Sequence, residues 1–193
     1  NLFIAIIFLF SLSGPLFSNL SFAQETSQEE EALLVAKKTF EDEFYDVSLT
    51  LFKSFLDKFP QSVLVSEANF YIGQCYFNQK KYNDAIACFE KLLNLKSAGT
   101  FGDRLYYWIA EAYFKSNNFL KAYNYYTLLL TEYPKSAYVA HAFYSLGWCL
   151  LEQDKFEEAK EKFIEFKNKF PQDALRDEAD FKVIECLYNL KDY

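Results

Sequence analysis

The segment ANFYIGQCYFNQKKYNDAIACFEKLL, residues 68–93, decides the fold, because it holds two helical patterns joined by a short polar turn. Gly73 and Tyr76 are spaced for one face of a first helix, and Ala85 and Phe89 for one face of a second. Small residues let two helices approach closely, and aromatic side chains fill the space beside them. The segment therefore predicts a pair of antiparallel helices.

This pattern returns every 37 residues along the chain. Pro134 and Pro171 lie 37 residues apart, and Pro60 lies twice that distance before Pro134. A position for small residues and a position for aromatic residues keep the same period. The two series are Ala36, Gly73, Ala110, Gly147 and Ile184, and Phe52, Phe89, Tyr126 and Phe163. A fixed period of this length indicates an array of supersecondary units that bury their apolar faces against their neighbours.

We therefore predict an all-α fold, a right-handed solenoid of antiparallel helix pairs. The array occupies residues 31–193, holds about four and a half repeats and is truncated at the C-terminus. Proline lacks a backbone N–H and disfavours helix in the residue before it, so each proline marks the end of a second helix. Ser62, Ser136 and Asp173 follow the prolines by two residues and are expected to cap the next helix.

The N-terminal segment differs in composition from the rest of the chain. Residues 1–23 carry no charge, although the chain has 20 basic and 27 acidic residues. An apolar run at 2–10 is followed by a Ser-Gly-Pro interruption and a small-x-small ending at 21–23, which is typical of a secretory signal peptide. We predict a cleaved signal peptide at 1–23, with an uncleaved anchor as the alternative, and a flexible lead-in at 24–30.

Composition disfavours several classes of function. A net charge of −7 argues against nucleic-acid partners, which require an excess of Lys and Arg. His141 has no evident catalytic partner and the cysteines form no C-x-x-C pair, so we expect no catalysis, no cofactor and no metal. Cys75, Cys149 and Cys186 share one repeat position, which favours buried thiols. A disulfide between Cys75 and Cys88 is the alternative.

The repeats resemble the tetratricopeptide repeat, whose pattern is W-x2-L-G-x2-Y followed by Ala, Phe and Pro. The second copy has Asn69, Ile72, Gly73, Tyr76, Ala85, Phe89 and Ser97 at these positions. The third has Tyr106, Ile109, Ala110, Tyr113, Ala122, Tyr126 and Pro134, and the fourth has Phe143, Leu146, Gly147, Leu150, Ala159, Phe163 and Pro171. The resemblance implies that the first helices of the pairs line a concave groove.

The expected groove is rich in aromatic side chains, which suit the anchoring of a peptide. The candidate partner-binding residues are Phe70, Tyr71, Gln74, Phe77, Tyr107, Trp108, Glu111, Phe114, Tyr144 and Trp148. For Phe70, Tyr107 and Tyr144, packing between repeats is an equally weighted alternative. Trp108 and Trp148 lie outside the packing pattern and favour contact with a partner.

The repeat length points to a narrower resemblance. Repeats of 37 residues, rather than about 34, are similar to those of two bacterial envelope families. These are the tetratricopeptide lipoprotein of the outer-membrane β-barrel assembly machine and the periplasmic cell-division coordinator of the Tol-Pal system. Segments 68–93 and 141–163 carry this likeness.

The resemblance implies a non-catalytic protein–protein interaction scaffold of the bacterial cell envelope. We expect a periplasmic protein that binds an envelope protein or peptide in the groove, in outer-membrane assembly or division. Membrane association is expected only through a partner or an uncleaved signal. One alternative is a targeting arm of an envelope enzyme whose catalytic domain lies beyond residue 193, and another is an array that self-associates through its exposed end.

Overall fold

The computed structural model describes residues 15–94 and 101–191. Within these ranges the chain forms nine helices and no strand, which confirms the predicted all-α fold. The helices are α1 (Pro15–Glu41), α2 (Tyr45–Lys58), α3 (Val65–Asn78), α4 (Tyr82–Leu93), α5 (Gly102–Lys115), α6 (Phe119–Glu132), α7 (Val139–Leu151), α8 (Phe156–Lys169) and α9 (Arg176–Leu190).

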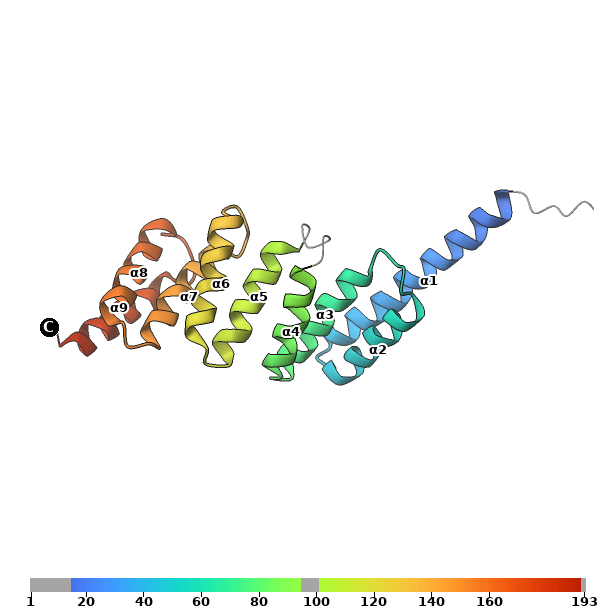
Figure 1. The fold of residues 1–193 in the computed structure, drawn as a ribbon. Helices are drawn as coiled ribbons and strands as arrows, with labels where there is room; N and C mark the ends of the chain where they lie inside the picture. The colour runs from blue at the N-terminus through green and yellow to red at the C-terminus, as the bar shows by residue number, and fades with distance from the viewer. Residues whose placement is uncertain (1–14, 95–100, 192–193) are drawn as a thin grey trace, which may run out of the picture.

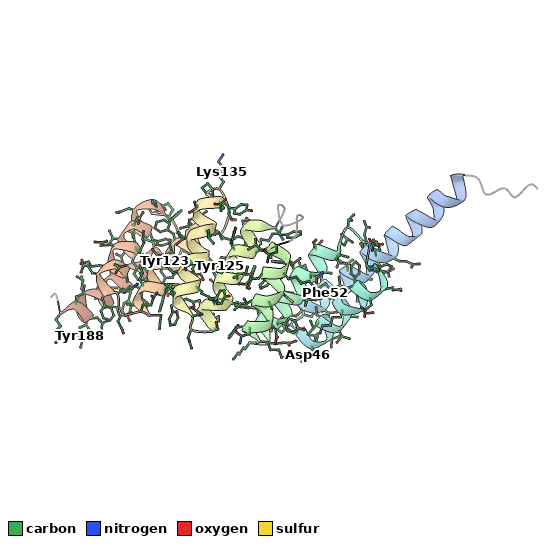
Figure 2. The ribbon with its side chains drawn as sticks, viewed as in Figure 1. Asp46, Phe52, Tyr123, Tyr125, Lys135 and Tyr188 are labelled. Carbon is green, nitrogen blue, oxygen red and sulfur yellow. The ribbon has the colours of Figure 1, made fainter. Side chains whose placement is uncertain are left out.

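The helices stack into one elongated array, and each packs mainly against the helix before it and the helix after it (Figure 1). Side chains fill the space between the helices along the array (Figure 2). The N-terminal turns of α1 project beyond the other helices (Figure 1). Contact restricted to neighbouring elements is the property of a solenoid, in which each repeat is stabilised by the repeats beside it.

The helices begin at a strict interval of 37 residues, which confirms the period read from the sequence. The second helices begin at residues 45, 82, 119 and 156, and the first helices after α1 begin at residues 65, 102, 139 and 176. The turns inside the pairs repeat as well, because residues 43, 80, 117, 154 and 191 all have positive φ. None of these five residues is glycine, so each turn holds an L residue in a left-handed conformation that costs about 1–2 kcal/mol.

The paired helices cross closely at the predicted small residues. A Cβ on Gly73 would lie 2.4 Å from the ring of Phe89, and a Cβ on Gly147 would lie 2.6 Å from the ring of Phe163. Glycine is therefore required for this approach. The whole aromatic series is buried in the array: Phe52, Phe89, Tyr126 and Phe163.

The turns after the prolines differ from the expected caps. Ser62, Ser136 and Asp173 lie two residues before the N-cap positions, which are occupied by Leu64, Tyr138 and Leu175. Their side-chain oxygens accept hydrogen bonds from the backbone N–H groups of those residues at 3.1, 3.2 and 2.9 Å. They stabilise the turn that precedes the helix, because the long repeat places extra residues between the proline and the helix.

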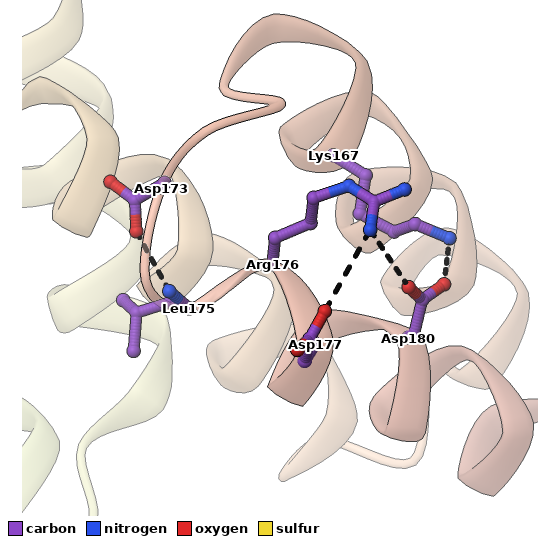
Figure 3. Close-up of polar contacts among 6 residues, drawn as sticks. All are labelled: Lys167, Asp173, Leu175, Arg176, Asp177 and Asp180. Atoms are coloured by element: carbon purple, nitrogen blue, oxygen red, sulfur yellow. Dashed lines mark hydrogen bonds and ion pairs between the residues drawn. The ribbon is translucent and has the colours of Figure 1, made fainter.

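The junction of α8 and α9 shows one such turn beside an ion-pair network (Figure 3). Asp180 of α9 is paired with Lys167 of α8 and with Arg176 of its own helix, the latter at 3.8 Å. These contacts tie the last described helix to the preceding pair.

The N-terminal segment also differs from the expectation. Residues 24–30, expected as a flexible lead-in, are helical within α1, and Glu29 accepts a hydrogen bond from the Ser62 hydroxyl at 2.7 Å. Glu and Gln are good helix formers, which explains the continuation of the helix. Of the predicted signal peptide, residues 1–14 lie outside the described residues and residues 15–23 belong to α1. No described helix is both long and apolar enough to span a bilayer.

Candidate functional site: a hollow between α5 and α7

A hollow of about 290 Å³ lies between the first helices of the third and fourth copies, α5 and α7. Four of its lining residues are among the predicted partner-binding residues: Glu111, Phe114, Tyr144 and Trp148. The others are Lys115, Tyr126, His141, Ser145 and Glu152. We call this the α5–α7 hollow.

One repeat position explains why the hollow lies at this boundary. Trp108 and Ser145 are 37 residues apart and thus occupy equivalent places on α5 and α7. Between α3 and α5, the ring of Trp108 packs edge-on against Phe77, with the ring centroids 5.1 Å apart. Between α5 and α7, Ser145 supplies only a hydroxymethyl group. The space that an indole fills at one boundary is therefore open at the next.

The same position is filled at the two outer boundaries. Tyr71 of α3 stacks on Phe52, with ring centroids 5.3 Å apart and planes 13° from parallel. Lys182 of α9 places its ammonium 3.9 Å from the ring centroid of Trp148 and forms an ion pair with Glu185 at 2.7 Å. Of the four residues at this position, Ser145 has the smallest side chain.

Tyr126 supplies a polar group at the base of the hollow. It is the member of the buried aromatic series that carries a hydroxyl, and this hydroxyl donates a hydrogen bond to Glu111 at 2.5 Å. Burial raises the pKa of Tyr126 well above its usual value, and the Glu111 carboxylate raises it further. The phenol is therefore a stable donor that holds Glu111 in place.

A second phenol lines the hollow, and its hydroxyl lies near Trp148 and near Glu178 of α9. Tyr144 is 5% exposed, and its buried hydroxyl oxygen makes no hydrogen bond of normal geometry with the described residues. Burial raises the pKa of Tyr144, and the carboxylates of Glu178 and Glu185 raise it further.

Two packed tyrosines adjoin the hollow at His141. Tyr107 stacks on Tyr138 with ring centroids 4.4 Å apart, and its hydroxyl oxygen lies 3.3 Å from Nδ1 of the exposed His141. Burial and the charge of Glu111 raise the pKa of Tyr107. Within the described residues, no group of three or more His, Cys, Asp or Glu side chains could hold a metal ion.

The other predicted partner-binding residues pack within the array. Phe70 is 3% exposed and lies against Phe89 and Phe101, which favours the packing alternative over contact with a partner. Tyr71, Phe77, Tyr107 and Trp108 are half-buried against aromatic neighbours, and Gln74 is half-buried. For these residues, contact with a partner stays a prediction.

Sequence reasoning missed Ser145, Tyr126, Lys115 and Glu152 as lining residues. The signal that could have found the hollow is the series Tyr71, Trp108 and Ser145, in which a small residue interrupts bulky ones at the repeat interval.

The burial of the cysteines agrees with the expectation of buried thiols. Cys75, Cys149 and Cys186 are fully buried, and Cys88 is half-buried.

Comparison with known families identifies the repeats. Profiles of the tetratricopeptide repeat match residues 66–97, 104–136 and 141–173, which together make up about half of the chain. The chain thus belongs to the tetratricopeptide repeat family. Arrays of this family are in general non-catalytic scaffolds that bind protein partners on extended surfaces.

Solved structures with little sequence identity share the fold. A MamA fragment (41-end) from Desulfovibrio magneticus RS-1 is 15% identical, with a TM-score of 0.70, and the match covers 85% of this chain and 86% of that one. A putative kinesin light chain of Podosopora anserina with nearly identical TPR-like repeats is 10% identical, with a TM-score of 0.68 and coverage of 86% and 88%. A tetratricopeptide repeat protein from Parabacteroides merdae ATCC 43184 is 17% identical, with a TM-score of 0.70 and coverage of 86% and 62%.

No curated protein matches the chain by sequence. The narrower resemblance to the two envelope families finds no support among these matches. At such low identity the structural likenesses establish the fold alone.

Proposed function

We propose that the chain is a non-catalytic protein–protein interaction scaffold of the bacterial cell envelope, which holds a segment of a partner protein in the α5–α7 hollow. The observation that carries this proposal is the open space at Ser145, where the neighbouring boundary is filled by Trp108. Aromatic side chains that surround a recessed place are the usual anchoring sites of protein interfaces.

The size of the hollow supports a side chain as its occupant. Pockets for small molecules and cofactors have volumes of roughly 300–1,000 Å³. At about 290 Å³ and open to solvent, the α5–α7 hollow lies just below this range. It suits one large side chain of a peptide that continues along α5 and α7.

Site-specific photo-cross-linking tests this site. A photoreactive amino acid would replace Lys115, which lines the hollow, and in a matched control would replace Leu128, which is 41% exposed on α6. After irradiation in cells of the source organism, we expect a discrete cross-linked protein for the Lys115 variant and none for the Leu128 variant. Equal cross-linking from both positions, or none from Lys115, would contradict the proposal.

The envelope location is supported by the uncharged residues 1–23 and the polar segment that follows them. We propose export to the periplasm, with roles in outer-membrane assembly or division as the resemblance of the repeats implies. The test is a fusion of the natural N-terminus, through residue 30, to a phosphatase that is active only after export. An active reporter whose N-terminus begins at Gln24 supports a cleaved signal, whereas an inactive reporter would refute export.

An enzyme-targeting arm is the second candidate function. The catalytic domain of such an enzyme could pack on the side of α9 that carries Phe181 and Ile184, which are 65% and 62% exposed. Figure 2 shows Tyr188 at the same end of the array. A catalytic domain that packs on this side would bury these residues. Hydrolase or transferase activity that copurifies with the natural protein, and is lost on Phe181→Asp, would support this candidate.

A further inference from the structure

We propose that the side chain held in the α5–α7 hollow is a tryptophan of the partner protein, whose indole packs against Phe114 as the indole of Trp108 packs against Phe77 at the preceding boundary. This inference rests on the proposed function, because it names the side chain of the partner segment that the same hollow accepts.

The first argument is that the chain itself holds an indole at the equivalent place of the preceding boundary. Trp108 and Ser145 are one repeat apart, and so are Phe77 and Phe114. Between α3 and α5, the rings of Trp108 and Phe77 meet edge-on, with centroids 5.1 Å apart and planes at 78°. Between α5 and α7, Phe114 and Ser145 both line the hollow. The ring that would receive an indole is therefore present, while Ser145 supplies no ring to cover it.

The second argument is the aromatic character of the walls. Besides Phe114, the lining includes the rings of Tyr126, Tyr144 and Trp148. Lys182 of α9 places its ammonium 3.9 Å from the ring centroid of Trp148, so a charged group already contacts this ring. Aromatic pairs in offset or edge-to-face arrangements are more favourable than burial of the same area alone. An indole offers two fused rings to such walls and gains more from them than an aliphatic side chain does.

The third argument is the placement of the charged groups. Lys115, His141 and Glu152 are exposed where they line the hollow, whereas Glu111 is half-buried. The exposed groups carry both signs of charge, so they do not select a charged anchor. They suit the polar backbone of a peptide on either side of the anchoring side chain.

Glu111 supplies a carboxylate where the preceding copy has Gln74. At that preceding boundary, the buried Nε1 of Trp108 has no hydrogen-bond partner among the described residues. Glu111 accepts the hydrogen bond from Tyr126 at Oε1, and a carboxylate has further acceptor positions. An indole carries one N–H donor and no acceptor. A carboxylate at this place therefore favours tryptophan over an aromatic or aliphatic anchor without a donor.

The test is a titration of the isotope-labelled full-length protein, followed by NMR. The probes are N-acetyl-tryptophan amide, its isostere N-acetyl-benzothienylalanine amide, in which sulfur replaces the indole N–H, and N-acetyl-leucine amide. We expect saturable shifts of the backbone amide signals of Phe114 and Ser145 with the tryptophan probe. Binding should be at least threefold weaker with the isostere and at least tenfold weaker with the leucine probe.

Two variants with an added indole locate the binding. Ser145→Trp places an indole of the chain itself in the hollow and should abolish saturable binding of the tryptophan probe. Leu128→Trp is the matched control, because it adds the same side chain on α6 at a residue that is 41% exposed and does not line the hollow. Binding should be unchanged in this control. Thermal unfolding verifies that both variants are folded, and the comparison of the three probes in the wild-type protein depends on neither.

Three results would overturn the inference: no saturable shift at Phe114 and Ser145, equal affinity for either of the other two probes, or undiminished binding to the folded Ser145→Trp protein. Equal affinity for another probe would still leave the hollow as a partner site. Failure of the inference is thus distinguishable from failure of the proposed function, which is decided independently by cross-linking from Lys115.

Discussion

The boundary between α3 and α5 and the boundary between α5 and α7 are built from the same repeat, and among the described residues a hollow lies at the second of them. At the first, Trp108 packs against Phe77 and Gln74 stands where the next copy has Glu111. At the second, Ser145 leaves the space open and the hydroxyl of Tyr126 holds Glu111. Residues that follow the repeat pattern build the helical array. Residues that depart from it determine the free space and the polar groups at each boundary.

The largest expected effect comes from removing the indole that fills the first boundary. Trp108→Ser should lower the free energy of unfolding by about 2–3 kcal/mol. This is less than the roughly 3–5 kcal/mol of a fully buried tryptophan, because Trp108 is half-buried and its buried Nε1 has no partner. Urea denaturation measures the change. Wild-type stability in this variant would show that Trp108 does not support the boundary.

The tyrosines beside the second boundary should make the protein sensitive to alkali. The pKa values of Tyr107, Tyr126 and Tyr144 are raised in the folded protein, chiefly by burial. The unfolded chain releases these protons near pH 10, so stability is complete below that pH and is lost above it. The expected slope is about 1.4 kcal/mol per pH unit for each such tyrosine.

Denaturation at a series of pH values between 9 and 11 would measure this slope. Tyr126→Phe should reduce the slope by the share of one tyrosine. An unchanged slope in this variant would mean that Tyr126 does not titrate with unfolding.

Substitution by phenylalanine should change the free energy of unfolding in opposite directions at two tyrosines of the hollow. Tyr126→Phe removes a donor to a carboxylate and should cost about 1–2 kcal/mol of unfolding free energy. Tyr144→Phe removes a buried hydroxyl that makes no hydrogen bond of normal geometry and should raise stability by up to about 1 kcal/mol. Thermal and urea unfolding of the two variants, measured side by side, compares them. Equal losses would contradict the assigned hydrogen bonding.

The smallest expected effect on stability concerns the turn with positive φ that the copies share. Lys80 has a φ of 60° in the turn between α3 and α4, where glycine adopts the left-handed conformation without steric cost. Lys80→Gly should raise the free energy of unfolding by about 0.5–1 kcal/mol. Asp154→Gly, in the equivalent turn before α8, should gain less, because aspartate tolerates this conformation better than lysine does. A loss of stability in Lys80→Gly would contradict the account of the turn.

The sequence predicts the scaffold well, because the constraints that form it recur in every copy. Gly73 and Gly147 must be small beside Phe89 and Phe163, and this requirement is visible as a period. The hollow is harder to predict because it depends on a single departure from the pattern, Ser145. The packing of Trp108 at the equivalent position must be known before the small side chain of Ser145 can be recognised as leaving a space.

The sequence also does not predict which individual aromatic residues are buried. Phe70 and Trp148 belong to the same helical surface pattern, but Phe70 packs against Phe101 of the following repeat, whereas Trp148 remains at the hollow. The pattern places both residues on the first helices of their pairs. It does not predict which side chains of the neighbouring repeat pack against each residue. Contacts between copies, which involve residues more than 30 positions apart, decide the difference.

The central claim is that the residue at position 145 decides whether the second boundary can hold a partner. The most direct measurement is the yield of cross-linked partner from a photoreactive residue at Lys115, compared between Ser145→Trp and the matched control Ser145→Ala. An indole at this position should fill the hollow as Trp108 fills its own boundary. We predict at least a tenfold loss of cross-linking with Ser145→Trp and full yield with Ser145→Ala, at unchanged thermal stability. Full yield from both variants would contradict the account.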